Sequence, residues 1–167
     1  MPLLYYNINM KTIILYATKY GAAQEIAQRI ANKLPGGDAC EIYNIKDTLP
    51  ALDSFDRIIF GSSVYAGSIR EEAKTFLANN EKVMQEKTLG LFLSGIGTDG
   101  KDTYFKSNFP ENILQKAKAR GFLGGVFDPK KANFMERLII KIVSKKSDYI
   151  NTINDRRIEK FAEDMKA

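Results

Sequence analysis

The feature that most constrains the fold is a buried strand that passes directly into an amphipathic helix. Residues 11–17, KTIILYA, are an almost unbroken apolar run, which is typical of a strand covered on both faces. In residues 21–34, GAAQEIAQRIANKL, apolar residues recur at helical spacing until PGGD at 35–38 ends the helix. Such a strand needs further elements on both sides, so the rest of the chain must supply more strands and helices.

The remainder of the chain repeats this alternation. We expect further strands at 39–45, 56–63, 88–95 and 121–128, and helices at 70–79, 110–120, 133–146 and 154–165. Strands that alternate with helices form parallel sheets through right-handed crossovers, which place helices on both faces. The sequence therefore predicts an α/β three-layer sandwich around a five-stranded parallel sheet. We expect one domain over residues 10–167, after a short N-terminal extension at residues 1–9.

The composition limits the chemistry that this domain can perform by itself. The chain has 167 residues, no histidine and one cysteine, Cys40. Histidine-dependent catalysis, the usual zinc sites and an intrachain disulfide are therefore excluded. Any reaction must rely on a bound cofactor or on carboxylate, lysine, tyrosine and hydroxyl groups. No apolar run is long enough to span a bilayer and no signal peptide is recognisable, so we expect a cytoplasmic protein.

The chain is basic, with a net charge of +5 and an isoelectric point near 9.2. This balance is compatible with an ordinary solvated surface, and also with an anionic partner such as a membrane surface. The basic residues are dispersed, and no aromatic residues alternate with them as single-strand binding requires. We therefore expect no binding to nucleic acid.

Three connections follow the first, third and fourth expected strands, and ligands of open parallel sheets bind at that edge. The first connection, ATKYGAAQ at 17–24, offers small residues and helix-start amides to a phosphate. The second, GSSVYAGSIRE at 61–71, offers hydroxyls and Tyr65, whose ring could lie against a flat heterocycle. The third, SGIGTDGKDTY at 94–104, exposes backbone groups to a polar ring edge. Each connection alone is also compatible with an ordinary turn, and their shared edge is what favours a site.

These stretches resemble the flavodoxin-like family. Its signature after the first strand, T/S-x-T-G-x-T, wraps the phosphate of flavin mononucleotide (FMN). Thr18 and Gly21 match this signature, whereas Tyr20 and Ala23 replace two of its threonines. The resemblance implies the strand order 2-1-3-4-5 and FMN as the cofactor. It implies that the cofactor-binding residues are Thr18, Lys19, Tyr20, Gly21, Ala22, Ala23, Ser62, Ser63, Val64, Tyr65, Ala66, Gly67, Ser94, Gly95, Ile96, Gly97 and Thr98.

A narrower similarity involves ILYATKYGAAQEIA at 13–26, GSSVYAGSI at 61–69 and FMERLIIKIVSKK at 134–146. These segments are similar to menaquinone-linked protoporphyrinogen IX dehydrogenases and their relatives, which are also basic. This similarity implies an FMN-dependent oxidoreductase that acts with a redox partner protein or on a quinone or porphyrinogen substrate. Two alternatives stay open. One is a flavodoxin-type electron carrier, and the other is a flavodoxin fold that has lost its cofactor, as the two replaced threonines would allow.

The helix expected at 133–146 has an apolar face with basic residues beside it. The apolar face consists of Phe134, Met135, Leu138, Ile139, Ile142 and Val143. The basic residues off this face are Arg137, Lys141, Lys145 and Lys146. Such a helix would ordinarily cover the sheet with its apolar face in the core. The alternative is peripheral contact with a membrane surface or with a quinone-bearing partner.

Overall fold

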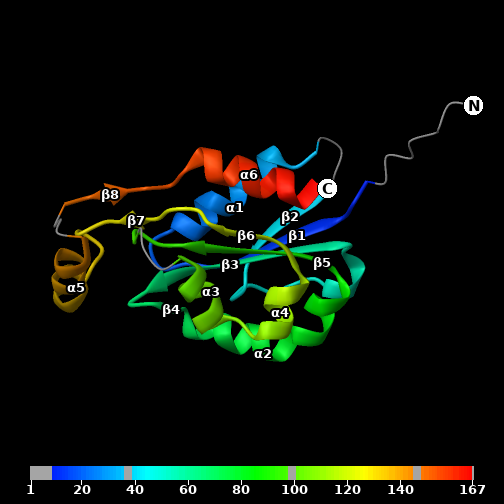
Figure 1. The fold of residues 1–167 in the computed structure, drawn as a ribbon, viewed down its shortest axis with the longest axis horizontal. Coiled ribbons are helices and arrows are strands. Elements are labelled where there is room, and N and C mark those ends of the chain that lie inside the picture. Colours follow the sequence, from blue (N-terminus) through cyan, green and yellow to red (C-terminus); the bar gives the residue numbers. More distant parts are fainter. Residues whose placement is uncertain (1–8, 36–38, 98–100, 145–147, 167) are drawn as a thin grey trace, which may run out of the picture.

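The computed structural model describes residues 9–35, 39–97, 101–144 and 148–166. Within these residues, a parallel sheet forms the centre of the fold (Figure 1). Its five main strands are β1 (Thr12–Ala17), β2 (Cys40–Asn44), β3 (Arg57–Tyr65), β5 (Thr88–Ser94) and β6 (Ala117–Phe122). They lie in the order β2-β1-β3-β5-β6, which confirms the predicted order 2-1-3-4-5.

Helices cover both faces of this sheet, so the predicted three-layer sandwich is confirmed. α1 (Ala22–Lys33) and α6 (Asp155–Lys166) lie on one face (Figure 1). α2 (Glu71–Glu86), α3 (Lys101–Asn108) and α4 (Glu111–Lys116) lie on the other. The sheet therefore presents only its edges and strand ends to a ligand.

The central strands divide their side chains between two apolar cores. In β1, Ile13 packs with the cluster beneath α2, and Ile14 packs with the cluster beneath α1 and α6. Gly61 in β3 lies opposite Phe92 of β5, and a Cβ atom at Gly61 would come within 2.1 Å of that ring. A glycine is needed there because the aromatic ring occupies the space of a side chain.

The segment between β5 and β6 departs from the sequence prediction in two places. Residues 101–108, for which no helix or strand was predicted, form α3, and residues 117–120, predicted as the end of a helix, begin β6. Alanine, lysine and arginine favour helices intrinsically, which explains the incorrect boundary. Parallel pairing with the buried strand β5 outweighs that local preference. The predicted strand at 121–128 accordingly splits between β6 and a short strand, β7 (Val126–Phe127).

Several short elements complete the fold. β4 (Ser68–Ile69) forms a hairpin with the end of β3, and a 3-10 turn, η1 (Leu52–Ser54), precedes β3. β7 pairs in antiparallel fashion with β8 (Ile150–Asn151). Between β7 and β8 lies α5 (Phe134–Ser144), which stands beyond the carboxyl ends of the sheet strands (Figure 1).

The expectation that this helix covers the sheet with its apolar face is wrong. Phe134 and Ile142 are 74% and 70% exposed, and Met135 and Leu138 are exposed as well. Ile140, which falls off the apolar stripe, packs instead against the small cluster around Phe127. Both faces of the sheet are already covered by other helices, so α5 has no apolar sheet surface on which to pack. No helix in the described part of the chain has the length and hydropathy needed to cross a membrane.

Candidate functional site

The connections after β1, β3 and β5 meet at the carboxyl edge of the sheet, around two adjoining cavities. The first cavity has a volume of about 50 Å³, and the predicted residues that line it are Thr18, Lys19, Tyr20, Ala22, Ser63, Val64, Tyr65, Ser94, Gly95 and Ile96. The second cavity, of about 210 Å³, shares residues of the second and third connections and adds Ala66, Gly67 and Gly97. The shared edge expected from the topology therefore brings the three predicted segments together.

Four of the predicted residues do not line either cavity or cannot be placed. Ala23 is fully buried in the core beneath α1, and Ser62 is buried within β3. Gly21 precedes α1 with a positive φ of 90°, a conformation that favours glycine. Thr98 lies outside the described residues. Gly21 and Ala23 thus shape the turn and its packing rather than the cavity wall.

The first connection is stabilised by its own hydroxyl. The amide of Gly21 donates to Oγ1 of Thr18 at 2.9 Å, which fixes the turn that leads into α1. Lys19 and Arg70 both line the first cavity and give it two cationic groups, each with a carboxylate partner: Glu136 for Lys19, and Glu72 for Arg70 at 3.3 Å. Partial burial lowers the pKa of Lys19, and the charge of Arg70 lowers it further.

The second connection is a rigid hairpin rather than the loop that the sequence suggested. β3 continues to Tyr65, and Ala66 and Gly67 form the turn into β4, both with positive φ. The side chain of Asn108 in α3 forms two hydrogen bonds with this hairpin. Its Oδ1 accepts from the amide of Ile69 and its Nδ2 donates to the carbonyl of Gly67, each at 2.9 Å. Tyr65 therefore stands on a fixed support, and its ring lies 5.0 Å from the Lys19 ammonium.

The third connection is held against the segment that follows β6. The amide of Gly95 donates to the carbonyl of Gly124 at 3.0 Å. A Cβ atom on Gly125 would come within 2.8 Å of the backbone of Gly95, so the two segments approach closely at a glycine. This contact brings Val126 and Phe127 of β7 into the wall of the first cavity.

Seven wall residues in the described part of the chain are not among the binding residues predicted from the sequence. These are Arg70, Tyr104, Phe122, Val126, Phe127, Ile139 and Ile140. Arg70 and Tyr104 lie at the ends of the second and third connections, and their nearness in sequence to the predicted residues could have indicated them. No local pattern connects Ile139 and Ile140 of α5 with the strand ends, since only the tertiary fold brings them there.

Glu136 of α5 is the residue near the site that was least expected from the sequence. It is 5% exposed, forms an ion pair with Lys19 and accepts a hydrogen bond from the hydroxyl of Tyr20. Burial is the main cause that raises the pKa of Tyr20, so this phenol stays protonated and donates. A carboxylate from outside the sheet therefore contacts the connection that was predicted to bind a phosphate.

Ser63 contributes a buried hydroxyl with no hydrogen-bond partner among the described residues. Such a group is costly to bury, and each instance calls for a physical reason. Ser63 lines the first cavity, so a polar atom of a ligand could supply the missing partner. The neighbouring Ser62 differs, because its Oγ donates to the carbonyl of Ser63 at 3.0 Å and accepts from the amide of Arg70 at 3.2 Å.

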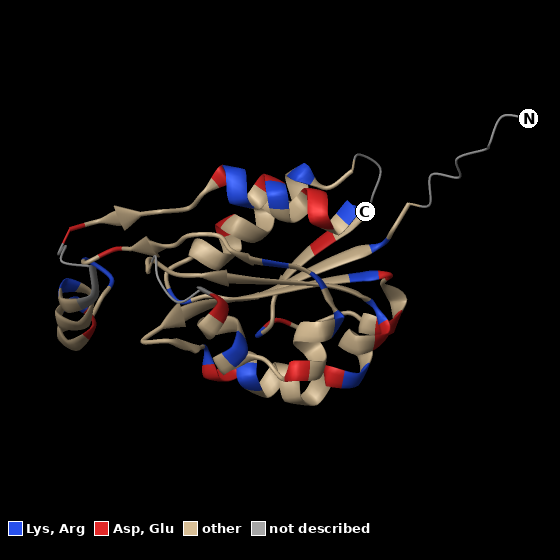
Figure 2. Cartoon of the chain, in the orientation of Figure 1, with Lys and Arg blue, Asp and Glu red and all other residues tan. Residues whose placement is uncertain are grey.

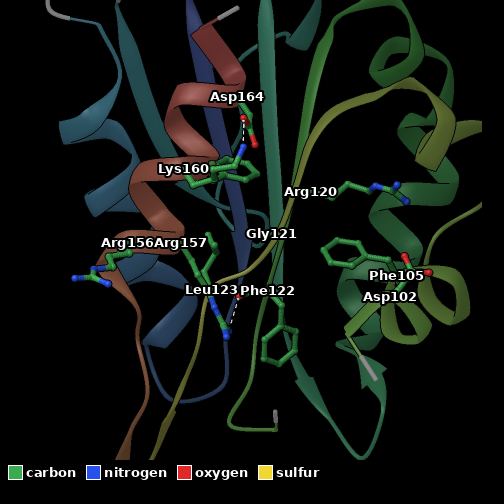
Figure 3. Close-up of a pocket in the computed structure, with 11 residues that line it drawn as sticks. Asp102, Phe105, Arg120, Gly121, Phe122, Leu123, Arg156, Arg157, Lys160 and Asp164 are labelled. Carbon is green, nitrogen blue, oxygen red and sulfur yellow. Dashed lines mark hydrogen bonds and ion pairs between the residues drawn. The ribbon is translucent and has the colours of Figure 1, made fainter. Parts of the chain in front are cut away.

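A larger groove of about 490 Å³ runs beside β6 and shares Phe122 with the second cavity (Figure 3). Basic side chains surround it, but Figure 3 shows that Arg120 and Arg156 point in opposite directions. Lys160 is paired with Asp164 at 2.7 Å. Because Arg120 and Arg156 diverge, these side chains do not converge on one anion site, and the convergent edge of the sheet remains the candidate.

Comparison with known proteins identifies the family. The family model described as Flavodoxin domain matches residues 13–152. The chain belongs to the flavodoxin-domain family. Protoporphyrinogen IX dehydrogenase [quinone] from Escherichia coli is 21% identical over 148 residues, which covers 83% of this chain and 81% of that protein. Membership in the flavodoxin-domain family implies FMN as the cofactor.

Solved structures show the same flavodoxin fold. Fusobacterium nucleatum flavodoxin bound to FMN has a TM-score of 0.53 and 18% identity, with 94% of this chain and 98% of that chain covered. A flavodoxin, WrbA-like protein from Agrobacterium tumefaciens has a TM-score of 0.55 and 17% identity, with coverage of 94% and 98%. Rubredoxin oxygen:oxidoreductase from Desulfovibrio gigas has a TM-score of 0.52 and 15% identity, and this chain spans only 37% of its length.

The residues present at the edge suit a phosphorylated flavin. Lys19 and Arg70 supply positive charge, and the hydroxyl of Ser63 lacks a protein partner among the described residues. Tyr65 supplies an aromatic ring on a fixed hairpin. These features are those that a ligand with an anionic end and a flat, polar-edged ring requires.

Substitution of the two neighbouring serines tests whether the hydroxyl of Ser63 lacks a hydrogen-bond partner in the protein. In protein without added flavin, Ser63→Ala should leave the free energy of unfolding unchanged or raise it by up to about 1 kcal/mol, because an unsatisfied group is removed. Ser62→Ala should lower it by about 1–3 kcal/mol, because the amide of Arg70 loses its acceptor. Chemical denaturation measures both. Equal losses in the two variants would show that Ser63 has a protein partner.

Proposed function

We propose that this protein is an FMN-binding oxidoreductase. The observation that carries the proposal is the convergence of three segments, from the ends of β1, β3 and β5, on one pair of cavities. Lys19, Arg70 and the amides at the start of α1 would hold the phosphate. Tyr65 would lie against the ring, and the backbone from Ser94 to Gly97 would bind its polar edge.

FMN supplies hydride and electron transfer when it is bound, so the protein itself needs no catalytic acid or base. A reaction carried out by the cofactor is compatible with a chain that has no histidine. The residues around the cavities would bind and orient the cofactor. Ile139 and Ile140 of α5, which line the second cavity, would exclude water from the ring.

Tyr65 provides a test of the proposed cofactor site. FMN titrated into the protein should lose fluorescence and shift its visible spectrum as it binds. Tyr65→Ala should raise the FMN dissociation constant about tenfold, since loss of a stacked aromatic face costs roughly 1–3 kcal/mol in comparable base-stacking sites. Tyr65→Phe keeps the ring and should bind within about threefold of the unmodified protein. No spectral change with any amount of FMN would contradict the proposal.

The relatives favour a particular branch of chemistry, the oxidation of a porphyrinogen with a quinone as acceptor. The E. coli relative carries that activity in its name, and it matches over most of both chains. The basic character of this chain and the apolar, exposed α5 are consistent with a quinone dissolved in a membrane. These features support our proposal that the protein acts in the manner of the protoporphyrinogen-dehydrogenase-like branch.

An anaerobic reaction distinguishes this enzyme from an electron carrier. Oxidised, FMN-loaded protein mixed with protoporphyrinogen should lose its flavin absorbance, and a soluble naphthoquinone should restore it, because the substrate donates electrons and the quinone accepts them. Protein that reacts with neither compound, but exchanges electrons with a flavodoxin reductase, would be a carrier. The carrier alternative has specific support, because this chain aligns with nearly the whole length of a solved flavodoxin.

The exposed face of α5 supports peripheral contact with a membrane. Phe134, Met135, Leu138 and Ile142 are exposed large hydrophobic residues on one short helix. Arg137 and Lys141 are exposed on the same helix, and Figure 2 shows α5 mostly tan, whereas α2 and α6 carry many charges of both signs. An apolar face with flanking basic groups is the pattern of a helix that lies at a lipid surface.

Sedimentation with lipid vesicles tests this contact. The protein should sediment with anionic vesicles and much less with neutral ones, because apolar burial and charge attraction act together. The double variant Phe134→Ser/Ile142→Ser removes part of the apolar face and should reduce the bound fraction roughly several-fold. Lys74→Gln on α2 removes one exposed positive charge from a different helix and serves as the control. Equal binding to neutral and anionic vesicles would contradict the proposed surface.

A further inference from the structure

The first connection is already in contact with an anion, the carboxylate of Glu136 in α5. Oε1 pairs with the ammonium of Lys19, and Oε2 accepts from the hydroxyl of Tyr20 and from the amide of Asn133, the latter at 3.1 Å. An ammonium, a phenol and a backbone amide thus surround a carboxylate that is almost fully buried. This is the set of donors that a bound anion requires.

A simpler role for Glu136 explains only part of this arrangement. Asn133 and Glu136 form a reciprocal capping box at the start of α5, since Oδ1 of Asn133 also accepts from the amide of Glu136 at 2.8 Å. A capping box needs one side-chain oxygen and forms equally well in solvent. It gives no reason to bury a charged group against Lys19 and Tyr20, which is costly without compensation.

The carboxylate and the phosphate of FMN require the same positive group. A phosphate monoester carries about −1.5 to −2 charges at pH 7 and would repel a carboxylate at the same ammonium. The space that the helix of Glu136 leaves at the strand ends is also limited. Cavities of about 50 and 210 Å³ are smaller than the roughly 300–1,000 Å³ typical of ligand sites, and Ile140 of α5 lines both. In the proposed site, the phosphate of FMN and the carboxylate of Glu136 would therefore compete for Lys19.

We propose that the side chain of Glu136 competes with FMN for the same position in the site. Its carboxylate stands in for the phosphate of FMN at Lys19 and Tyr20, and FMN binds by displacing it. Glu136 therefore sets the affinity for FMN and narrows the preference for FMN over riboflavin, which has no phosphate. This inference rests on the proposed function and deepens it by naming a residue that determines cofactor selectivity.

The variant Glu136→Gln tests the competition, because glutamine keeps an oxygen for the capping box and removes the charge. Flavin fluorescence gives the dissociation constants of FMN and riboflavin. For FMN the constant should fall about tenfold or more, whereas for riboflavin it should change by less than about threefold, because only FMN competes for the anion position. Similar gains for both flavins, or no gain for FMN, would overturn the proposal.

Glu25 offers a matched control near the same connection. It lies in the first turn of α1, is exposed and pairs with Arg29 rather than with Lys19. Glu25→Gln removes the same charge, and both flavin constants should stay within about twofold, because exposed charges interact weakly through solvent. A gain in FMN affinity equal to that of Glu136→Gln would show a general effect of charge and would overturn the proposal.

A measurement without flavin separates this inference from the proposed function. Inorganic phosphate should raise the melting temperature of Glu136→Gln clearly more than that of the unmodified protein, with chloride of equal ionic strength as the reference. If no FMN binding were found in either protein, the proposed function would fail and the phosphate result alone would decide. Equal effects of phosphate on both proteins would overturn the competition.

Discussion

Burial of β1, β3 and β5 on both faces forces their backbone groups to pair with one another, because no water reaches them. Parallel pairing has a geometric consequence, since it places all the carboxyl ends at one edge. The helices already fill both faces, so that edge is where chain segments from different parts of the sequence can meet. The candidate site is therefore a product of the same pairing that stabilises the core.

The sequence predicts those parts of the structure that depend on local periodicity. The apolar run of β1 and the helical spacing of α1 are strong signals, and they place the first connection correctly. β6 was misplaced because Ala117–Arg120 consists of residues with helical preference, and only the partner strand decides their conformation. The strand order came from resemblance to a family and not from any local pattern.

The candidate site could be predicted only as far as its residues belong to the three connections. Tyr20 and Glu136 are separated by 116 positions, and no periodicity relates them. The apolar stripe of α5 suggested a core-facing helix, but Glu136 and Ile140 determine its orientation and turn the stripe outward. These long-range contacts, together with the helices that already cover both faces of the sheet, explain why hydrophobic patterning alone gave the wrong orientation.

The side chain of Asn108 links the hairpin of β3 and β4 to α3 through two hydrogen bonds. A two-residue turn at the rim of a domain is usually among its most mobile parts. Here the carbonyl of Gly67 and the amide of Ile69 are both bonded to one side chain of α3. The backbone on either side of the turn after Tyr65 is therefore anchored to a helix that packs on the core, so any substitution of Asn108 would release the turn beside the Tyr65 ring.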